Sequence, residues 1–201
     1  MINYPNKKII KNEVTNSTSN SKKNSQIYNA ANRGIDLEKA INISNSYYDD
    51  EKRAIITKRP TPIHVVKVDY AHGCRITDAY FEKQSTTDYN GVYRGIYIDF
   101  DCKETQSSTS FSLNNISSHQ IKHLKKVLLQ GGIAFFIIYF KKKDEVFLID
   151  SSFIIDRFEN SERKTIPYSD FLEHGYIIEQ GFIPRLKYLD VVDKVYFNET
   201  K

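Results

Sequence analysis

The stretch from Tyr97 to Lys103, Tyr-Ile-Asp-Phe-Asp-Cys-Lys, carries side chains that could hydrolyse a phosphodiester. Residues two positions apart leave a β-strand on the same face, so Asp101 and Lys103 would point the same way. A carboxylate held beside an ammonium can bind a metal ion and offset negative charge on a phosphate. The same pattern also fits a half-buried strand with a solvated face and an incidental ion pair. The strand alone leaves both interpretations open.

A further carboxylate, Asp88, lies 13 residues before Asp101 in a polar segment. Magnesium prefers hard oxygen ligands, so two carboxylates at this spacing are candidate ligands for it. An acidic residue, a gap and then acid-x-Lys on a strand is the nuclease pattern written PD-(D/E)xK. Here Thr87 stands where that pattern has proline. Acid-x-Lys is common, so the pattern is weak evidence by itself.

Two predicted helices would flank this strand, whose other face is apolar (Ile96, Ile98, Phe100, Cys102). The first is expected to start near Asn32 or Arg33 and carries an apolar stripe at helical spacing, with Glu38 at the edge of the stripe. The second begins with a capping box in which Ser117 is the N-cap and Gln120 is at N3, and it runs to about residue 130.

The remaining pattern alternates strands and helices. Strands are expected at about 53–57, 63–70, 79–81, 133–140 and 146–150, and helices at 151–158, 169–174 and 188–197. This order predicts an α/β fold in which helices flank a mixed central sheet. Residues 60–91 are long for a connection and are expected to project as a stalk-like insertion that ends in the turn dipeptide Asn90-Gly91. The nuclease domain would then span 33–201.

Residues 1–32 are rich in Asn, Ser, Thr and Lys and are expected to form a disordered basic tail. Residues 1–33 hold six basic residues against one glutamate, a net of +5 in a chain of net +4. Such a tail suits contact with a polyanion, and it equally suits a role in solubility alone. The polar N-terminus, the two cysteines and the absence of a long apolar run favour a cytoplasmic protein that does not enter a membrane.

Several segments together resemble the RecU family, the Holliday junction resolvases of low-GC Gram-positive bacteria and their relatives. The matching segments come in order and span nearly the whole chain: Asn32-Arg33-Gly34, Lys58–Pro62, Ser85–Gly91, Tyr97–Thr105, Thr109-Ser-Phe111, His119-Gln120 and Gly181–Arg185. Their combination is specific, although no single segment is.

The resemblance implies a fold like that of type II restriction endonucleases, a homodimer, and a stalk that enters the centre of the junction. It implies that Mg²⁺, or Mn²⁺ in its place, is held by Thr86, Asp88, Asp101 and Gln120. Lys103 would stabilise the transition state, and Glu38 matches an acidic position that supports such sites. The family usually has glutamate where this chain has Asp101. Aspartate is one methylene shorter and still ligates Mg²⁺, so this change is compatible with a shifted metal or a lower rate, and lost activity is less favoured.

Other polar residues have two interpretations each. Five basic residues are candidates for contact with DNA phosphates, and each could instead be a solvated surface charge. They are Arg33, Arg75, Lys83, Lys22 and Lys23. Gln120 could serve only the helix cap, or the cap and the metal together. His119 and His123 lie one helical turn apart, but a metal pair is not expected because no third ligand is evident.

The resulting hypothesis is a structure-specific endonuclease that resolves four-way (Holliday) DNA junctions in recombination and repair. The alternative is a non-catalytic protein that binds or anneals junction DNA and modulates recombination partners; the aspartate at 101 is its support in the sequence. A sequence-specific restriction endonuclease on the same fold is disfavoured by the stalk-like insertion. The resemblance also implies contact with the RecA recombinase and the branch-migration motor. One-metal and two-metal mechanisms are both compatible with this sequence.

Overall fold

The computed structural model describes residues 36–82 and 86–197, and the predicted tail (1–32) lies outside this part of the chain. Six of the described strands form one mixed sheet in the order β1-β4-β5-β7-β8-β10. These strands are β1 (Ala54–Lys58), β4 (Tyr89–Tyr93), β5 (Ile96–Thr105), β7 (Ile133–Phe140), β8 (Glu145–Asp150) and β10 (Tyr176–Ile177). Strands β5 and β7 are parallel, and every other neighbouring pair is antiparallel. The predicted mixed sheet is therefore confirmed.

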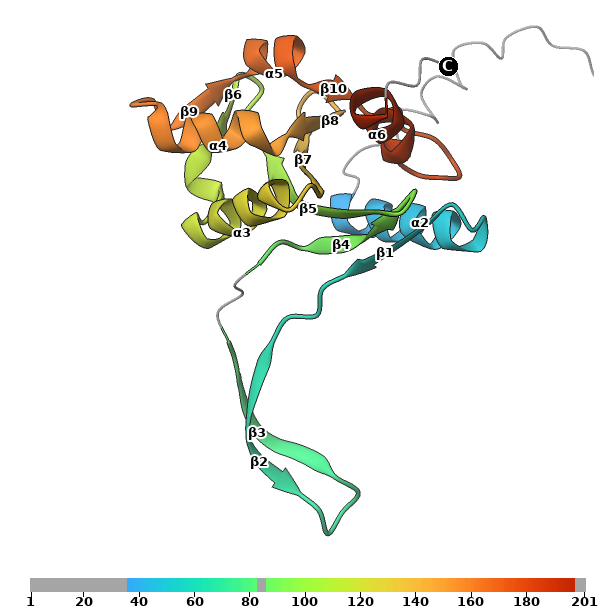
Figure 1. Cartoon of the computed structure of the whole chain (residues 1–201). Coiled ribbons are helices and arrows are strands. Elements are labelled where there is room, and N and C mark those ends of the chain that lie inside the picture. Colours follow the sequence, from blue (N-terminus) through green and yellow to red (C-terminus); the bar gives the residue numbers. More distant parts are fainter. Residues whose placement is uncertain (1–35, 83–85, 198–201) are drawn as a thin grey trace, which may run out of the picture. The chain divides into compact units, whose positions relative to one another are not determined.

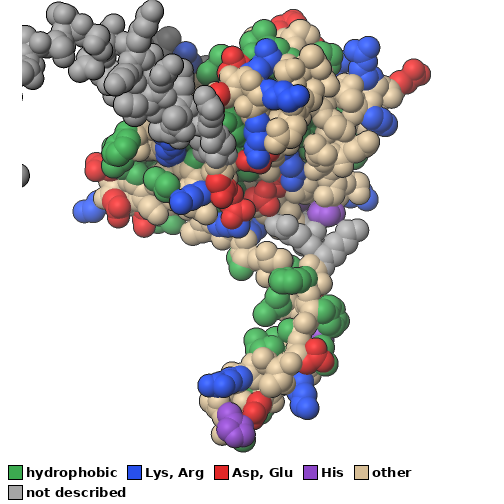
Figure 2. Space-filling model, turned by 180° about the vertical axis from the view of Figure 1, so that it is seen from behind, with side chains coloured by type: hydrophobic (Ala, Val, Ile, Leu, Met, Phe, Trp, Pro, Cys, Tyr) green, Lys and Arg blue, Asp and Glu red, His purple; other side chains and the backbone are tan. Residues whose placement is uncertain are grey.

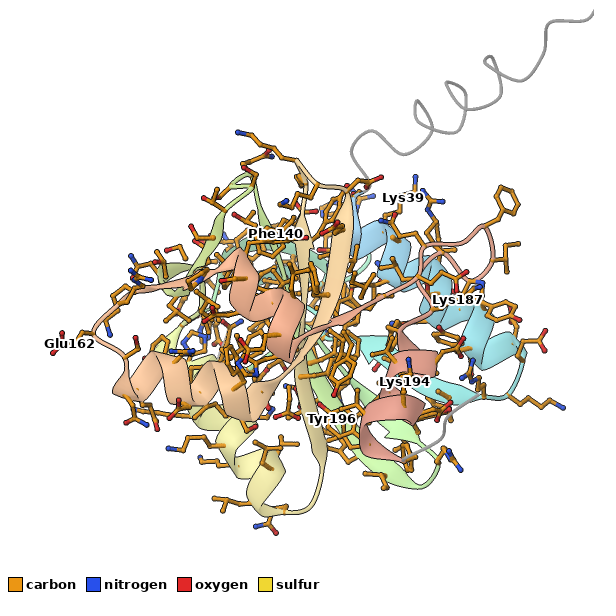
Figure 3. The ribbon with its side chains drawn as sticks, turned by 90° about the horizontal axis from the view of Figure 1, so that it is seen from above. Lys39, Phe140, Glu162, Lys187, Lys194 and Tyr196 are labelled. Carbon is orange, nitrogen blue, oxygen red and sulfur yellow. The ribbon has the colours of Figure 1, made fainter. Side chains whose placement is uncertain are left out.

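Helices cover both faces of this sheet, as the view from above shows (Figure 3). They are α2 (Leu37–Asp50), α3 (Ser118–Leu129), α4 (Ser151–Asn160), α5 (Tyr168–His174) and α6 (Tyr188–Tyr196). One apolar core joins the sheet to α2 and α6, and a second joins its other face to α3, α4 and α5. All eight residues of β7 are buried because successive side chains of this central strand alternate between the two cores.

The two helices that flank β5 start where side chains can cap them. Helix α2 begins at Leu37, about four residues later than predicted, because the Asp36 carboxylate accepts a hydrogen bond from the Lys39 amide as N-cap. Helix α3 begins with the predicted capping box of Ser117 and Gln120. Its Ile121 and Leu124 are buried in the second core, so the predicted stripe is confirmed.

The chain turns between β4 and β5 at Arg94-Gly95, where both residues have positive φ (51° and 79°). This is the two-residue hairpin geometry that matches strand twist. The prediction of a turn at Asn90-Gly91 was wrong, because both residues lie inside β4. Glycine is required at 91 for another reason: a Cβ there would lie 2.0 Å from the Ile55 carbonyl oxygen of β1.

Between β1 and β4 the chain forms a hairpin of its own, β2 (Ile63–Asp69) and β3 (Arg75–Phe81), which pairs only with itself among the described strands (Figure 1). This segment, hereafter the hairpin, lies within the predicted insertion, whose last residues (89–91) belong to the central sheet. Its strands are mostly exposed to solvent. Hydrophobic side chains are spread along it, with Lys and Arg side chains toward its tip (Figure 2).

The segment predicted as a polar loop (105–115) contains a short strand, β6 (Ser110–Ser112), and the turn of 3-10 helix η1 (Leu113–Asn115). Strand β6 pairs with β9 (Thr165–Pro167), far away in the sequence. Its Phe111 is buried against the second core, which a polar-loop pattern does not reveal.

None of the helices in the described part of the chain has the length and apolar character that a membrane span requires.

Candidate active site

The carboxylate of Asp101 lies at the centre of the candidate site. The residue is fully buried on β5, where helix α3 covers the polar face of the strand. The Gln120 side-chain amide donates a hydrogen bond of 2.7 Å to Asp101 Oδ1. The Lys103 ammonium lies 2.6 Å from Asp101 Oδ2 and forms an ion pair with it. The predicted same-face placement of Asp101 and Lys103 is therefore what the structure shows.

Burial raises the pKa of Asp101 to about 7, despite the opposing effect of the Lys103 ammonium. The nearby Asp88 carboxylate raises the pKa further. Asp88 lies just before β4, and its Oδ2 accepts a 3.3 Å hydrogen bond from the main-chain amide of Cys102. Two carboxylates that repel each other in a buried place favour either a proton or a cation between them.

One buried carboxylate oxygen of this set fits a magnesium ion. Oδ2 of Asp101 is buried, and its partner is the Lys103 ammonium of the ion pair rather than a hydrogen-bond donor of ordinary geometry. Such an oxygen has lone pairs available for a cation. Among the described residues no three His, Cys, Asp or Glu side chains gather closely enough to hold a metal by themselves.

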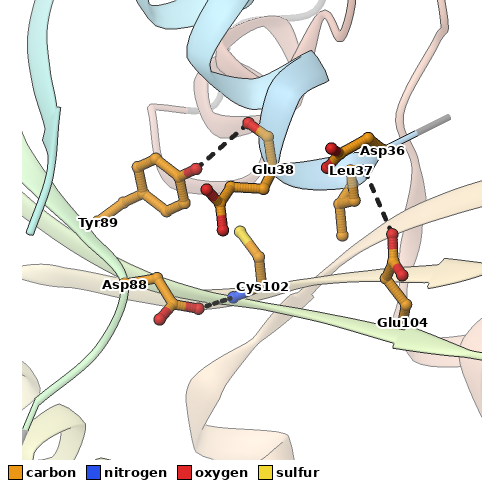
Figure 4. A pocket seen from close by; sticks show the side chains of 7 residues that line it. All are labelled: Asp36, Leu37, Glu38, Asp88, Tyr89, Cys102 and Glu104. Atoms are coloured by element: carbon orange, nitrogen blue, oxygen red, sulfur yellow. Dashed lines mark hydrogen bonds between the residues drawn. The ribbon is translucent and has the colours of Figure 1, made fainter. Parts of the chain in front are cut away.

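Glu38 reaches the site from the other side of β5. It lines a pocket of about 260 Å³ together with Asp88 and Cys102, and Figure 4 shows their side chains around it. Glu38 also forms an ion pair with Lys58 of β1. Burial raises the pKa of the Cys102 thiol well above its usual value, so this pocket does not present a reactive thiolate.

Gln120 and Thr86 are the other two predicted metal ligands. Oε1 of Gln120 accepts the Ser117 amide at 3.0 Å, while its nitrogen holds Asp101. The side chain therefore serves both the helix cap and the carboxylate, and metal ligation by Gln120 stays a prediction. Thr86 is half-buried two residues before Asp88, and its ligand role also stays a prediction.

Predicted DNA contacts are only partly within the described chain. Arg75 is exposed at the start of β3, in the hairpin, opposite Asp69. Lys22, Lys23, Arg33 and Lys83 lie outside the described residues.

Sequence reasoning missed a second buried carboxylate, Asp99, two residues before Asp101 on the same face of β5. It accepts hydrogen bonds from Arg59, Thr87, Tyr97 and His123. Two signals were available in the sequence: the two-residue spacing of Asp99 from Asp101, and the three-residue spacing of His123 from Gln120 on one helix. His123 Nε2 lies 2.8 Å from Oδ2 of the Asp99 carboxylate.

The raised pKa of Asp101 predicts how the stability of the metal-free protein depends on pH. The unfolded chain loses this proton near pH 3.8, whereas the folded chain holds it up to about pH 7, so stability should fall as pH rises through this window. In the Asp101→Asn variant, the side chain at this position is uncharged throughout this pH window. In EDTA at pH 8 the variant should melt several degrees above wild type, at roughly 2–4 °C per kcal/mol, and the difference should vanish near pH 4. If Asp101→Asn and wild type had equal melting temperatures at pH 8 as well as at pH 4, this prediction would be contradicted.

Two sequence comparisons match this chain to one protein family. The family model described as "Recombination protein U" (RecU) matches residues 32–194. A "Holliday junction resolvase RecU" of Geobacillus kaustophilus is 47% identical over 172 residues, which cover 83% of this chain and 86% of that protein. Another of the same name, from Lactococcus lactis, is 44% identical and covers 97% of this chain and 98% of its own.

Among solved structures, the Holliday junction resolvase Hjc of Archaeoglobus fulgidus aligns with 67% of this chain and 93% of its own. At a TM-score of 0.39 and 9% identity, this likeness is too weak to support an inference.

Proposed function

Because the chain belongs to the RecU family, we propose that it is a divalent-metal-dependent endonuclease that resolves four-way DNA junctions in recombination and repair. The observation that carries the catalytic part is the buried carboxylate of Asp101, with Lys103 at 2.6 Å and the Asp88 carboxylate beside it. This is the acidic pair and cation that metal-assisted phosphodiester hydrolysis requires.

In this proposal Asp88 and Asp101 hold Mg²⁺, or Mn²⁺ in its place, with Gln120 and Thr86 completing the ligand shell. When bound, the cation supplies Lewis acidity at the phosphate and lowers the pKa of a coordinated water. Gln120 keeps Asp101 oriented through its 2.7 Å hydrogen bond. Lys103, four-fifths buried, offsets the negative charge that grows on the phosphate and orients the attacking water. Glu38 supports the same site from the pocket behind β5.

Resolution requires two cuts in strands related by two-fold symmetry, which a homodimer with one site per protomer provides. Each cut leaves a 5′-phosphate and a 3′-hydroxyl. The hairpin, with its exposed apolar and basic side chains, is the element suited to reach the centre of a junction. Contact with the RecA recombinase and the branch-migration motor stays a prediction from the family resemblance.

The proposal is tested with a synthetic four-way junction and a linear duplex of the same arm sequence, each in Mg²⁺, Mn²⁺ or EDTA. We expect paired, symmetrically placed nicks in the junction only when a divalent ion is present. The mapped ends should carry a 5′-phosphate. Tight junction binding without cleavage in either ion would favour the non-catalytic alternative, for which the aspartate at position 101 is the supporting observation.

The basic tail should contribute to DNA binding through counterion release. Removing residues 1–30 removes five lysines and one glutamate. If all five lysines contact phosphates, the slope of log K against log salt should flatten by about 4 to 5 per protomer, at roughly 0.9 per phosphate contact. The measurement is a salt titration of junction binding in EDTA. An unchanged slope would assign the tail to solubility.

A further inference from the structure

The two legs of the hairpin meet the domain beside the candidate metal site. Arg59 is the first residue after β1 on the outgoing leg, and Asp88 is the last before β4 on the returning leg. The main-chain amide of Arg59 donates a 2.8 Å hydrogen bond to the carbonyl of Asp88. The residue that carries a proposed metal ligand is therefore held directly by the residue at which the hairpin departs.

The side chain of Arg59 continues inward from this contact. Its Nε donates to Asn90 Oδ1 at 3.1 Å, and its Nη2 donates to Asp99 Oδ2 at 2.6 Å. Tyr97 links the same two groups, since its hydroxyl accepts from Arg59 and donates to Asp99, each at 2.8 Å. The guanidinium thus spans from the edge of the hairpin to the middle of β5.

The carboxylate of Asp99 joins the elements that carry the other proposed ligands. Nε2 of His123, one turn beyond Gln120 on α3, lies 2.8 Å from Asp99 Oδ2. The Thr87 hydroxyl, between Thr86 and Asp88, donates to Asp99 Oδ1. Asp99 is fully buried. Its Oδ1 accepts from Thr87, so loss of that hydroxyl would leave a desolvated carboxylate oxygen. Its Oδ2 is shared by Arg59, Tyr97 and His123, so loss of one of these donors would remove the link between Asp99 and the element that carries it.

From this connectivity we infer that Arg59 and Asp99 form a positioning clamp, which holds both legs of the hairpin against β5 and α3 and so sets where Asp88 and Gln120 stand at the metal site. None of the clamp residues is a proposed ligand. The clamp acts as outer-shell support, whose loss typically costs about 10- to 100-fold in metal affinity. The inference rests on the proposed metal-dependent function and names the residues that organise its site.

The chain offers a matched control for Arg59 at the other end of the same strand. Arg53 directly precedes β1, is also partly buried, and also binds buried or half-buried carboxylates, Asp190 at 2.7 Å and Asp193 at 3.0 Å. Arg→Lys at either position keeps the positive charge but loses the planar, multidentate hydrogen bonding. Both variants should lower the melting temperature in EDTA, so stability alone does not separate them.

The first measurement is Mn²⁺ affinity, by calorimetry and by the metal-induced shift in melting temperature. Arg59→Lys should weaken Mn²⁺ binding about 10-fold or more, whereas Arg53→Lys should leave it within about twofold of wild type. Thr87→Val removes the hydroxyl at nearly equal volume and without any change of charge, and should weaken binding similarly. Thr87→Ser restores the hydroxyl and should recover wild-type affinity within about threefold.

The second measurement is single-turnover junction cleavage across a Mg²⁺ titration, with junction binding measured in EDTA. Arg59→Lys and Thr87→Val should shift the half-saturating Mg²⁺ concentration upward about 10-fold while DNA binding stays within about twofold. Wild-type metal affinity in both variants, or an equal loss in Arg53→Lys, would overturn the clamp. A wild type that binds Mn²⁺ but cuts no junction would overturn the proposed nuclease function, while the affinity comparison would still decide the clamp. Absence of Mn²⁺ binding by wild type would overturn both.

Discussion

Lys103→Ala should lower the rate of junction cleavage by about 10² to 10³-fold, the range seen when one preorganised donor to a developing oxyanion is lost. The ammonium is four-fifths buried and lies 2.6 Å from Asp101 Oδ2, where water screens it little. Junction affinity in EDTA should change by no more than about threefold, since a group that acts on the transition state contributes little to ground-state binding. The measurement is single-turnover cleavage in Mg²⁺ beside a gel shift in EDTA.

The matched control is Lys141→Ala. Lys141 is also a largely buried lysine, and its ion pair is with Glu104, the neighbour of Lys103 on β5. The Lys141→Ala variant should cleave the junction at a rate within about threefold of the wild-type rate. If Lys141→Ala loses as much as Lys103→Ala, the loss reflects the charge balance around β5 rather than a catalytic ammonium.

Two substitutions at Asp101 complete this test. Asp101→Asn should abolish cleavage while junction binding persists or tightens slightly, because a carboxylate near phosphates is repulsive. Asp101→Glu lengthens the side chain by one methylene, and it should keep measurable cleavage because it retains the carboxylate. Full activity in Asp101→Asn would mean that the chemistry lies elsewhere in the chain.

Shortening the hairpin should lower affinity for four-way junctions about 10-fold or more and leave affinity for linear duplex within about threefold. Ile63 and Phe81 are register partners, so residues 64–80 can be replaced by Asn-Gly, which forms a two-residue hairpin turn. Most of the removed residues are exposed and belong to a separate two-stranded sheet, so the melting temperature should change little. Equal loss on both DNAs would show that the hairpin does not read junction structure.

A point substitution refines this prediction. Tyr80 is an exposed aromatic residue of the hairpin, and Phe182 is an exposed aromatic residue outside it. An aromatic ring that stacks on an unpaired base is worth roughly 1–3 kcal/mol, or about 5- to 150-fold in affinity. Tyr80→Ala should weaken junction binding within that range, whereas Phe182→Ala should leave it unchanged. A larger loss of junction affinity in Phe182→Ala than in Tyr80→Ala would indicate that the DNA contact lies outside the hairpin.

Local pattern determined much of what surrounds the site. The two-residue alternation in β5 placed Asp101 and Lys103 on one face and the apolar residues on the other. The capping box of Ser117 and Gln120 located the start of α3 correctly. These features rest on interactions within a few residues of each other, which a sequence displays directly.

Tertiary pairing decided the rest. The polar face of β5 looks solvated in sequence, yet Asp99 and Asp101 are fully buried because α3 covers them. Asn90-Gly91 has the composition of a turn, but it lies in a strand because β1 approaches it closely. Arg59 meets Asp88 only through the pairing of β1 with β4 across the whole hairpin. Periodicity tells which side chains share a face, but long-range pairing determines what covers that face, and so whether a carboxylate is solvated or buried at a site.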